Sequence, residues 1–251
     1  LTTITQLGAP APMAITASQL TANAGALAKI SGAYTLSVSG VGAADAATVG
    51  DNSHVVSMAV SDASSAVATN FSSLNGNAKL SQINFTGGSL GMTLSQAQVL
   101  AGASTLAKIN GAYALSITGA TTANLDDFDA NSHVVSVAVS DSTDHITEAF
   151  DQLMAMGPKI SAIAVTTHAS EIELTQDQLF SGAATVAKLS GTYDLAIADV
   201  SAENATSVAA MAHVTGLSVA DTASNVGQYI DALQALGDSL ALITLNDEAP
   251  I

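Results

Sequence analysis

The chain has 251 residues, of which 48% are hydrophobic, 4% aromatic and 10% charged, and it contains neither cysteine nor tryptophan. Five lysines against 21 acidic residues give a net charge of −16. This argues against nucleic acid and anionic membranes as partners, because both need clustered cations. The lack of cysteine excludes disulfides and thiol chemistry, and no apolar run has the length of a membrane span.

One segment of the sequence occurs three times, at 27–34, 106–113 and 186–193, with its lysine spaced 79 and then 80 residues apart. A fixed long period predicts tandem repeats that stack on their neighbours. The predicted boundaries are 1–79, 80–159, 160–239 and, as the first strand of a fourth repeat, 240–251. The principal partners of each repeat are then the neighbouring repeats of the same chain.

Each repeat begins with an alternating apolar pattern that predicts a strand, as in Leu80 to Phe85. A helix is predicted next, because a hydroxyl residue is followed three positions later by glutamine, the pattern of a capping box. The repeated residues around this helix are the caps Thr16, Ser95 and Thr175, the lysines Lys29, Lys108 and Lys188, and the glycines Gly32, Gly111 and Gly191. We expect the lysines in the last turn and the glycines at the C′ position with positive φ.

A second strand is predicted at Tyr34 to Ser39 and its copies, followed by an Ala- and Asp-rich link that fits a short helix. The third strand has Val56, Met58 and Val60 facing inward. An aspartate closes it in each repeat, and aspartate is a favoured N-cap for the helix that follows. These aspartates are Asp62, Asp141 and Asp221.

One repeat therefore reads β-α-β-α-β-α, an α/β pattern. Strands that share a sheet and are separated by helices run parallel, with right-handed crossovers. The expected fold is a right-handed βα repeat solenoid with one parallel sheet, helices on one side, and three βα coils in each repeat of about 80 residues. The alternative is a doubly wound parallel sheet, which usually needs strands that are apolar on both faces.

Two groups of residues suggest metal binding. His54, His133 and His213 recur just before the third strand, but no second ligand repeats with them, so we expect them to cover the junction between helix and strand. Asp126, Asp127 and Asp129 form a carboxylate cluster in an expected loop, where calcium is the candidate ligand. The cluster does not recur in the other repeats, and no other cofactor is expected.

No catalytic motif is present, and each Ser, His or Asp that could serve in a triad recurs at equivalent places. A catalytic site is normally unique whereas structural roles repeat, so the chain is not expected to be an enzyme. The pattern in Val219 to Thr222, Ile243 to Asp247 and Leu174 to Gln178 resembles tandem-repeat regions of very large bacterial secreted or surface proteins. Many of those are adhesin-like, exported by type I secretion and associated with glycine-aspartate calcium repeats.

That resemblance implies an extracellular or cell-surface location and a role as spacer or interaction scaffold. A calcium- or carbohydrate-binding module is the alternative, and an accessory region of a secreted enzyme is a third. Small residues are expected on the outward face of the strands, where they would form a contact face for self-association or a glycan. Its members are Ser37, Ser57, Ser116, Ser136 and Ser218.

Overall fold

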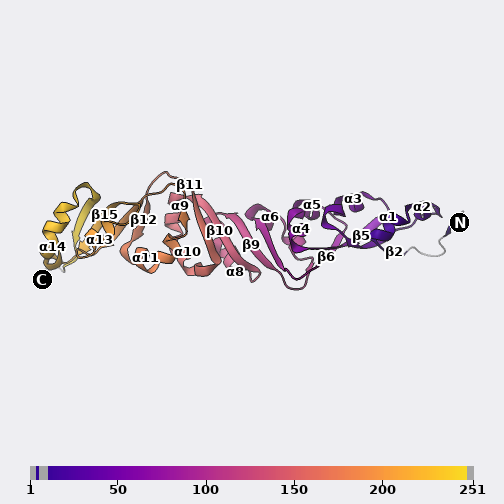
Figure 1. The fold of residues 1–251 in the computed structure, drawn as a ribbon, viewed down its shortest axis with the longest axis horizontal. Helices are drawn as coiled ribbons and strands as arrows, with labels where there is room; N and C mark the ends of the chain where they lie inside the picture. Colours follow the sequence, from indigo (N-terminus) through magenta and orange to yellow (C-terminus); the bar gives the residue numbers. More distant parts are fainter. Residues whose placement is uncertain (1–3, 6–10, 248–251) are drawn as a thin grey trace. The chain divides into compact units, whose positions relative to one another are not determined.

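The computed structural model describes residues 4–5 and 11–247. The chain divides into two compact units, unit 1 (Leu1–Ile117) and unit 2 (Thr118–Ile251). Strands and short helices alternate along each of them (Figure 1). Paired strands run parallel, which confirms the α/β class. The predicted repeat boundaries do not coincide with the division at 117/118 and stay a prediction.

Unit 1 contains short helices between short parallel strands. Its strands are β1 (Ile4–Thr5), β2 (Met13–Thr16), β3 (Ile30–Ser31), β4 (Leu36–Val41), β5 (Val55–Asp62), β6 (Leu80–Phe85), β7 (Gly91–Ser95), β8 (Ile109–Asn110) and the first part of β9 (Ala114–Ala120). Its helices are α1 (Ala17–Ala22), α2 (Ala24–Leu27), α3 (Ala46–Asp51), α4 (Ser64–Thr69), α5 (Phe71–Asn75), α6 (Gln96–Ala101) and α7 (Ala103–Leu106), with the 3₁₀ turn η1 (Ala43–Asp45).

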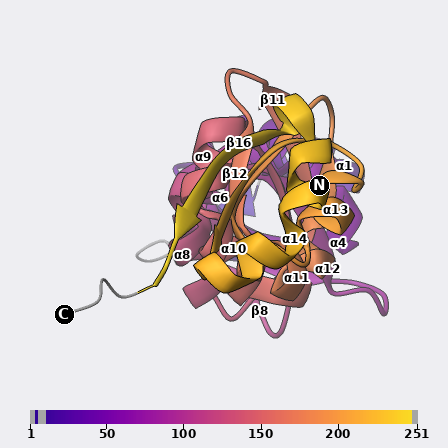
Figure 2. The same cartoon turned by 90° about the vertical axis from the view of Figure 1, so that its left-hand side faces the viewer.

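Unit 2 is likewise built of short helices between parallel strands. Its strands are β10 (Val134–Ser142), β11 (Ile160–Thr167), β12 (Ile172–Thr175), β13 (Leu189–Ser190), β14 (Leu195–Val200), β15 (Val214–Asp221) and β16 (Leu240–Leu245). Its helices are α8 (Leu125–Ala130), α9 (Thr143–Glu148), α10 (Phe150–Met156), α11 (Gln176–Ser181), α12 (Ala183–Val186), α13 (Ala205–Ala209) and α14 (Ala223–Ala235), with 3₁₀ turns η2 (Thr122–Asn124), η3 (Gly157–Lys159) and η4 (Gly237–Ser239). Helix α14 and the strand β16 face the viewer in Figure 2.

The single continuous sheet that the sequence predicts is wrong. Unit 1 has a sheet in the order β2-β4-β5-β6-β8 and a separate β1-β3 pair, and unit 2 has a sheet in the order β12-β14-β15-β16. Strands β10, β11 and β13 belong to another sheet, in which β11 lies between the other two.

The cause is a strand that the sequence reading missed, directly before each capping box. In unit 2, β11 is followed after a short loop by β12; β13 then pairs with β11, but β14 pairs with β12. In unit 1, β6 pairs with β8, whereas the Ala114 N–H of β9 donates to the Leu90 carbonyl next to β7. In both units, therefore, the row of paired strands breaks at the extra strand: the two-residue strand pairs with the strand before it, and the following strand lies beside the extra strand. The first predicted strand, 1–4, falls mostly outside the described residues, as do residues 248–251 of the last.

Local capping signals are largely confirmed. Thr16, Ser95 and Thr175 each form a capping box with the glutamine three residues later. The repeated glycines have positive φ, between 93° and 100°, but they follow a two-residue strand and not the helix itself. The repeated lysines lie beyond the helix end, so the predicted dipole contact is wrong. Lys188 instead donates from Nζ to the Gly157 carbonyl, at 2.9 Å.

The third predicted strand carries a β-bulge in its first and third copies, β5 and β15, and the bulge shifts the inward residues. Leu36 pairs with Val55 but Ser37 pairs with Ser57, so Val56 is the extra residue. Val56 is 46% exposed, whereas Val55 is buried. The predicted inward position of Val56 is therefore wrong, while Met58 and Val60 are buried as predicted.

The three aspartates at the end of this strand are not N-caps. The caps are the next residues, Ala63, Ser142 and Thr222. Each aspartate accepts the N–H of that cap residue and also an N–H 19 residues earlier in the chain. For Asp62 these donors are Ala63 and Ala43, at 2.8 and 2.9 Å. Each carboxylate therefore joins the end of its strand to a segment that lies 19 residues earlier in the chain.

Alternate residues of the long strands form the core. In β10, for example, Val137 and Val139 are buried while Ser136 and Ala138 are half-buried. Such alternation fits strands with one face covered by helices. Three phenylalanines, Phe71, Phe128 and Phe150, are among the largest fully buried side chains.

Candidate functional site

The predicted contact residues lie on the half-buried set of strand positions. Ser37 and Ser57 are direct neighbours across β4 and β5, and Ala14 of β2 lies beside Ser37. Ser116, Ser136 and Ser218 occupy the same kind of position in their strands, between buried apolar residues. The structure therefore places all five serines on the strand face opposite the core, and in unit 1 it brings Ser37 and Ser57 together.

A groove opens on this face in unit 2, where the third repeat departs from the other two. It measures about 260 Å³ and is lined by Glu171, Glu173, Ala196, Gly216 and Ser218, among others. Ala196 pairs with Gly216 across β14 and β15, and Glu173 pairs with Ala196 from β12. Two small residues thus form its floor, and carboxylates stand on one side.

The first two repeats have other residues at these places. Serine stands at the position of Gly216, and proline or glycine at the position of Glu171. The Glu171 carboxylate accepts a hydrogen bond from the Thr215 hydroxyl at 2.5 Å. Sequence reasoning missed these residues because it searched for what recurs; a search for departures from the repeat would have found them.

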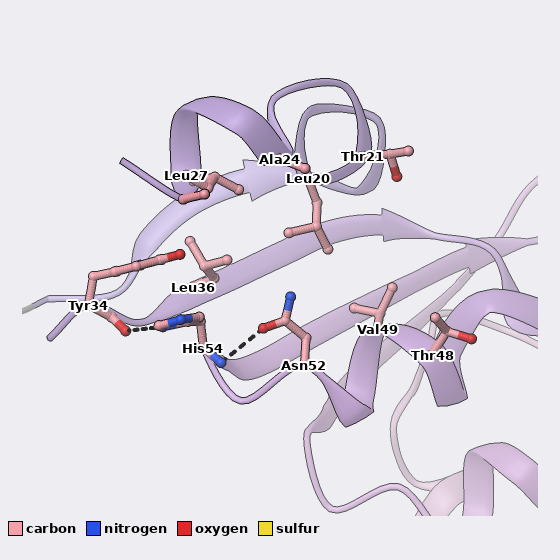
Figure 3. A pocket seen from close by; sticks show the side chains of 11 residues that line it. Leu20, Thr21, Ala24, Leu27, Tyr34, Leu36, Thr48, Val49, Asn52 and His54 are labelled. Atoms are coloured by element: carbon pink, nitrogen blue, oxygen red, sulfur yellow. Dashed lines mark hydrogen bonds between the residues drawn. The ribbon is translucent and has the colours of Figure 1, made fainter. Parts of the chain in front are cut away.

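A second hollow lies in unit 1 between α1, α2 and α3, with a volume of about 470 Å³. Figure 3 shows Leu20, Leu27 and Leu36 around it, with Tyr34 and His54 at one end. The two rings are stacked, with centroids 3.9 Å apart and planes within 5°. His54 Nδ1 lies 3.2 Å from the Tyr34 carbonyl oxygen, to which it donates.

The same ring pair occurs in unit 2. Tyr193 and His213 have centroids 4.2 Å apart, and His213 Nδ1 lies 3.1 Å from the Tyr193 carbonyl. Burial raises the pKa of the Tyr193 hydroxyl. The sequence showed that both residue types recur but not that they meet. The stacking places each histidine between the end of a helix and the start of a strand, where it packs on the tyrosine.

The carboxylates proposed for calcium lie on helix α8 and not in a loop. Asp126 accepts a hydrogen bond from Gln152, and Asp129 forms an ion pair with Lys159 at 2.9 Å. Asp127 is exposed in the first turn. Within residues 4–5 and 11–247, three or more His, Asp or Glu do not gather closely enough to hold a metal ion. Calcium binding at these residues stays a prediction.

Asp141 and His145 form a charged pair that the sequence reading did not single out. His145 Nδ1 lies 2.8 Å from Asp141 Oδ1. Burial by itself would raise the pKa of Asp141, but hydrogen bonds from Thr122, His145 and Ser142 outweigh it and the pKa is lowered. The bond to Asp141 in turn raises the pKa of His145. Each partner therefore favours the charged form of the other.

Comparison with known proteins gives no relative from which a role could be transferred. The chain matches no protein-family model, no curated protein and no solved structure. In the part of the chain that the structure describes, no helix is long and apolar enough to cross a membrane.

Proposed function

We propose that the chain is a structural and adhesive tandem-repeat segment of an extracellular bacterial protein, in which its coils form a right-handed βα solenoid. The recurrence of one tertiary contact supports this proposal. Asp62, Asp141 and Asp221 each accept an N–H from 19 residues earlier, from Ala43, Thr122 and Ala202. A bond repeated at fixed spacing ties each coil to the preceding one, as the stacked units of a solenoid require.

In this proposal the outward strand face makes the contacts, and the chain is not an enzyme. The single observation that carries the proposal is the half-buried row of small residues, in which Ser37 and Ser57 are paired neighbours. Small side chains let a second sheet or a glycan approach the backbone closely. Each contact is weak at about 25 cal/mol per Å² of apolar area. Useful affinity therefore comes from several repeats acting together.

The test places arginine on the face in all three repeats, at Ser57, Ser136 and Ser218. We expect folding to be retained, while self-association in sedimentation velocity and binding to glycan arrays are lost. The matched control carries three arginines on exposed helix-side positions, at Thr48, Ala123 and Ser207. If both triple variants bind and associate as the unchanged chain does, the face is only solvated and the proposal fails.

A carbohydrate-binding module is the second candidate, and the groove of unit 2 favours it. The carboxylates of Glu171 and Glu173 stand beside a floor of Ala196 and Gly216, where they could accept hydrogen bonds from sugar hydroxyls. Glu173→Gln, with Glu148→Gln on exposed α9 as the control, should then lower glycan binding without a change in self-association. Equal glycan binding by both variants would remove this candidate.

A further inference from the structure

A ring-on-glycine contact occurs twice in the chain. The Phe71 ring of α5 lies against Gly102, between α6 and α7. A Cβ added at Gly102 would stand only 2.3 Å from Phe71 Cε1. In unit 2 a Cβ at Gly182, between α11 and α12, would stand 3.0 Å from Phe150 Cε1 and 2.9 Å from Met154 Sδ. The same Cβ would also stand 2.6 Å from the Gln98 carbonyl oxygen at Gly102 and 2.4 Å from the Gln178 carbonyl oxygen at Gly182. The ring and the carbonyl four residues earlier therefore both leave room only for glycine at these two places.

The third copy of this ring position is Ile230 in α14, 80 residues after Phe150. Phe71 and Phe150 are 1% and 0% exposed, but Ile230 is 50% exposed. No helix pair follows α14 in the described part of the chain to cover it. Helix α14, which carries Ile230, lies at the end of unit 2 that faces the viewer in Figure 2.

Strand β16 pairs with β15 on one side, and among the described residues no strand pairs with its other edge. Ile83 of β6 donates its N–H to the Lys108 carbonyl at 2.8 Å, and Ile163 of β11 donates to the Lys188 carbonyl at 2.9 Å. Ile243 is the third copy, in β16, which is the last strand of its sheet among the described residues. Beside it, Leu242 and Leu245 are 59% and 55% exposed.

We propose that Ile230 and the free edge of β16 form a docking surface for one further strand–helix–strand segment of the same repeat. That segment places a glycine against Ile230 and a main-chain carbonyl on the Ile243 N–H. The chain covers the corresponding surfaces around Phe71 and Phe150 in this way, which identifies the occupant. The inference rests on the repeat stacking in the proposed function, but it does not depend on the outward face.

The first helix pair of the chain is not a matching occupant. Asn23 stands between α1 and α2 where Gly102 and Gly182 stand in the other copies. Its backbone is nearly the same, with φ −109° and ψ 17° against −101° and 13° at Gly102. The difference is therefore the side chain, which would stand between α1–α2 and any ring docked there. A second copy stacked end to end would bring Asn23 against Ile230.

The experiment extends the full chain by a second copy of residues 168–193, fused after Asp247. We expect the Ile243 amide to exchange with solvent about tenfold more slowly in the extended chain than in the unextended chain, because this edge amide gains a hydrogen-bond acceptor. The melting temperature of the extended chain should also rise, because the added segment covers the apolar side chain and pairs the strand edge. Unchanged exchange at Ile243 would overturn the proposal.

Two further proteins test the glycine. In the extended chain, Ile230→Phe should keep the slow exchange, because the added glycine accommodates the ring. Ile230→Phe combined with leucine in place of that glycine should lose it. Equal protection in both proteins would mean that strand pairing alone drives docking and would refute the glycine contact.

The chain without the extension tests the other occupant. If it forms dimers in which the Ile243 amide is already protected, a second copy occupies the surface and the proposal is wrong. We expect this chain to show fast exchange at Ile243. The outcome is separate from the arginine test of the outward face, because none of these changes touches that face.

Discussion

Replacing Asp141 by alanine should destabilise unit 2 more than any comparable change at the other two repeated aspartates. Its Oδ2 accepts the Thr122 N–H at 2.9 Å and the Thr122 hydroxyl at 3.0 Å. Its Oδ1 accepts the Ser142 N–H at 2.9 Å and His145 Nδ1 at 2.8 Å. The residue is 8% exposed, so water replaces little of this network.

The expected loss in the free energy of unfolding is about 2–4 kcal/mol. Two main-chain N–H groups, of Thr122 and Ser142, lose their acceptor, at about 1–3 kcal/mol each when it is not replaced. Both residues are half-buried, which allows partial hydration and favours the lower part of that range. Among the described residues the Asp62 carboxylate accepts the Ala43 and Ala63 N–H groups and no further donor, so Asp62→Ala should cost less.

Guanidinium unfolding followed by circular dichroism measures this loss as a lower midpoint at unchanged slope. Hydrogen exchange at the Thr122 amide localises it, because that amide should exchange faster in Asp141→Ala. The isosteric Asp141→Asn keeps one acceptor oxygen and should lose less than alanine. Ordinary surface substitutions change the free energy of unfolding by less than about 0.5 kcal/mol. If Asp141→Ala changes it by no more than that, Asp141 does not hold the segment at Thr122 to the end of its strand.

Three further predictions test other contacts. Because the pKa of His145 is raised, its charged bond to Asp141 stabilises the fold below the usual histidine pKa, and this stabilisation is lost as the pH rises through the raised pKa. His145→Asn, which keeps a hydrogen-bond donor, should therefore be less stable than the unchanged chain near pH 5.5 but not near pH 9. Parallel profiles of stability against pH for the two proteins would contradict this. Lys79→Met should cost about 1–3 kcal/mol in urea unfolding, because Lys79 Nζ donates to two carbonyls; no shift in midpoint would show that water replaces it. Val135→Thr should change stability by less than about 0.5 kcal/mol, since Val135 is 54% exposed, whereas Val137→Thr at 0% exposure should cost about 1–3 kcal/mol. Equal costs would contradict the outward position of Val135 and the inward position of Val137.

Features that depend on neighbours in sequence were predictable. The capping boxes of Ser95 and Thr175 are formed by residues three apart, so the sequence pattern and the hydrogen bonds coincide. The alternation in β10 is equally local, because side chains of a strand point to opposite faces in turn. The short helices between strands were also expected from the alanine-rich links, and α3, α8 and α13 occupy them.

Features that depend on residues distant in the sequence were not predictable. Asp62 and Asp141 were expected to cap the next helix, yet a decisive donor for each lies 19 residues away. The extra strands β7 and β12 have only 5 and 4 residues, too few for a pattern to separate them from the helix cap that follows. Val56 reads as inward by alternation, and only the pairing of Ser37 with Ser57 shows the bulge.

The candidate contact face poses the opposite problem, because recurrence cannot distinguish a functional surface from a structural requirement. Ser57 and Ser136 share a position for which a small side chain suits both explanations. The groove of unit 2 differs from the serine positions in two ways. Gly216 stands where the other two copies have serine, and two carboxylates, Glu171 and Glu173, line the same groove. The absence of a side chain at Gly216 deepens the outward strand face there, and the two carboxylates give that place negative charge. Variants at Glu173 therefore test for a local ligand, whereas variants at Ser57 test for contacts that all repeats share.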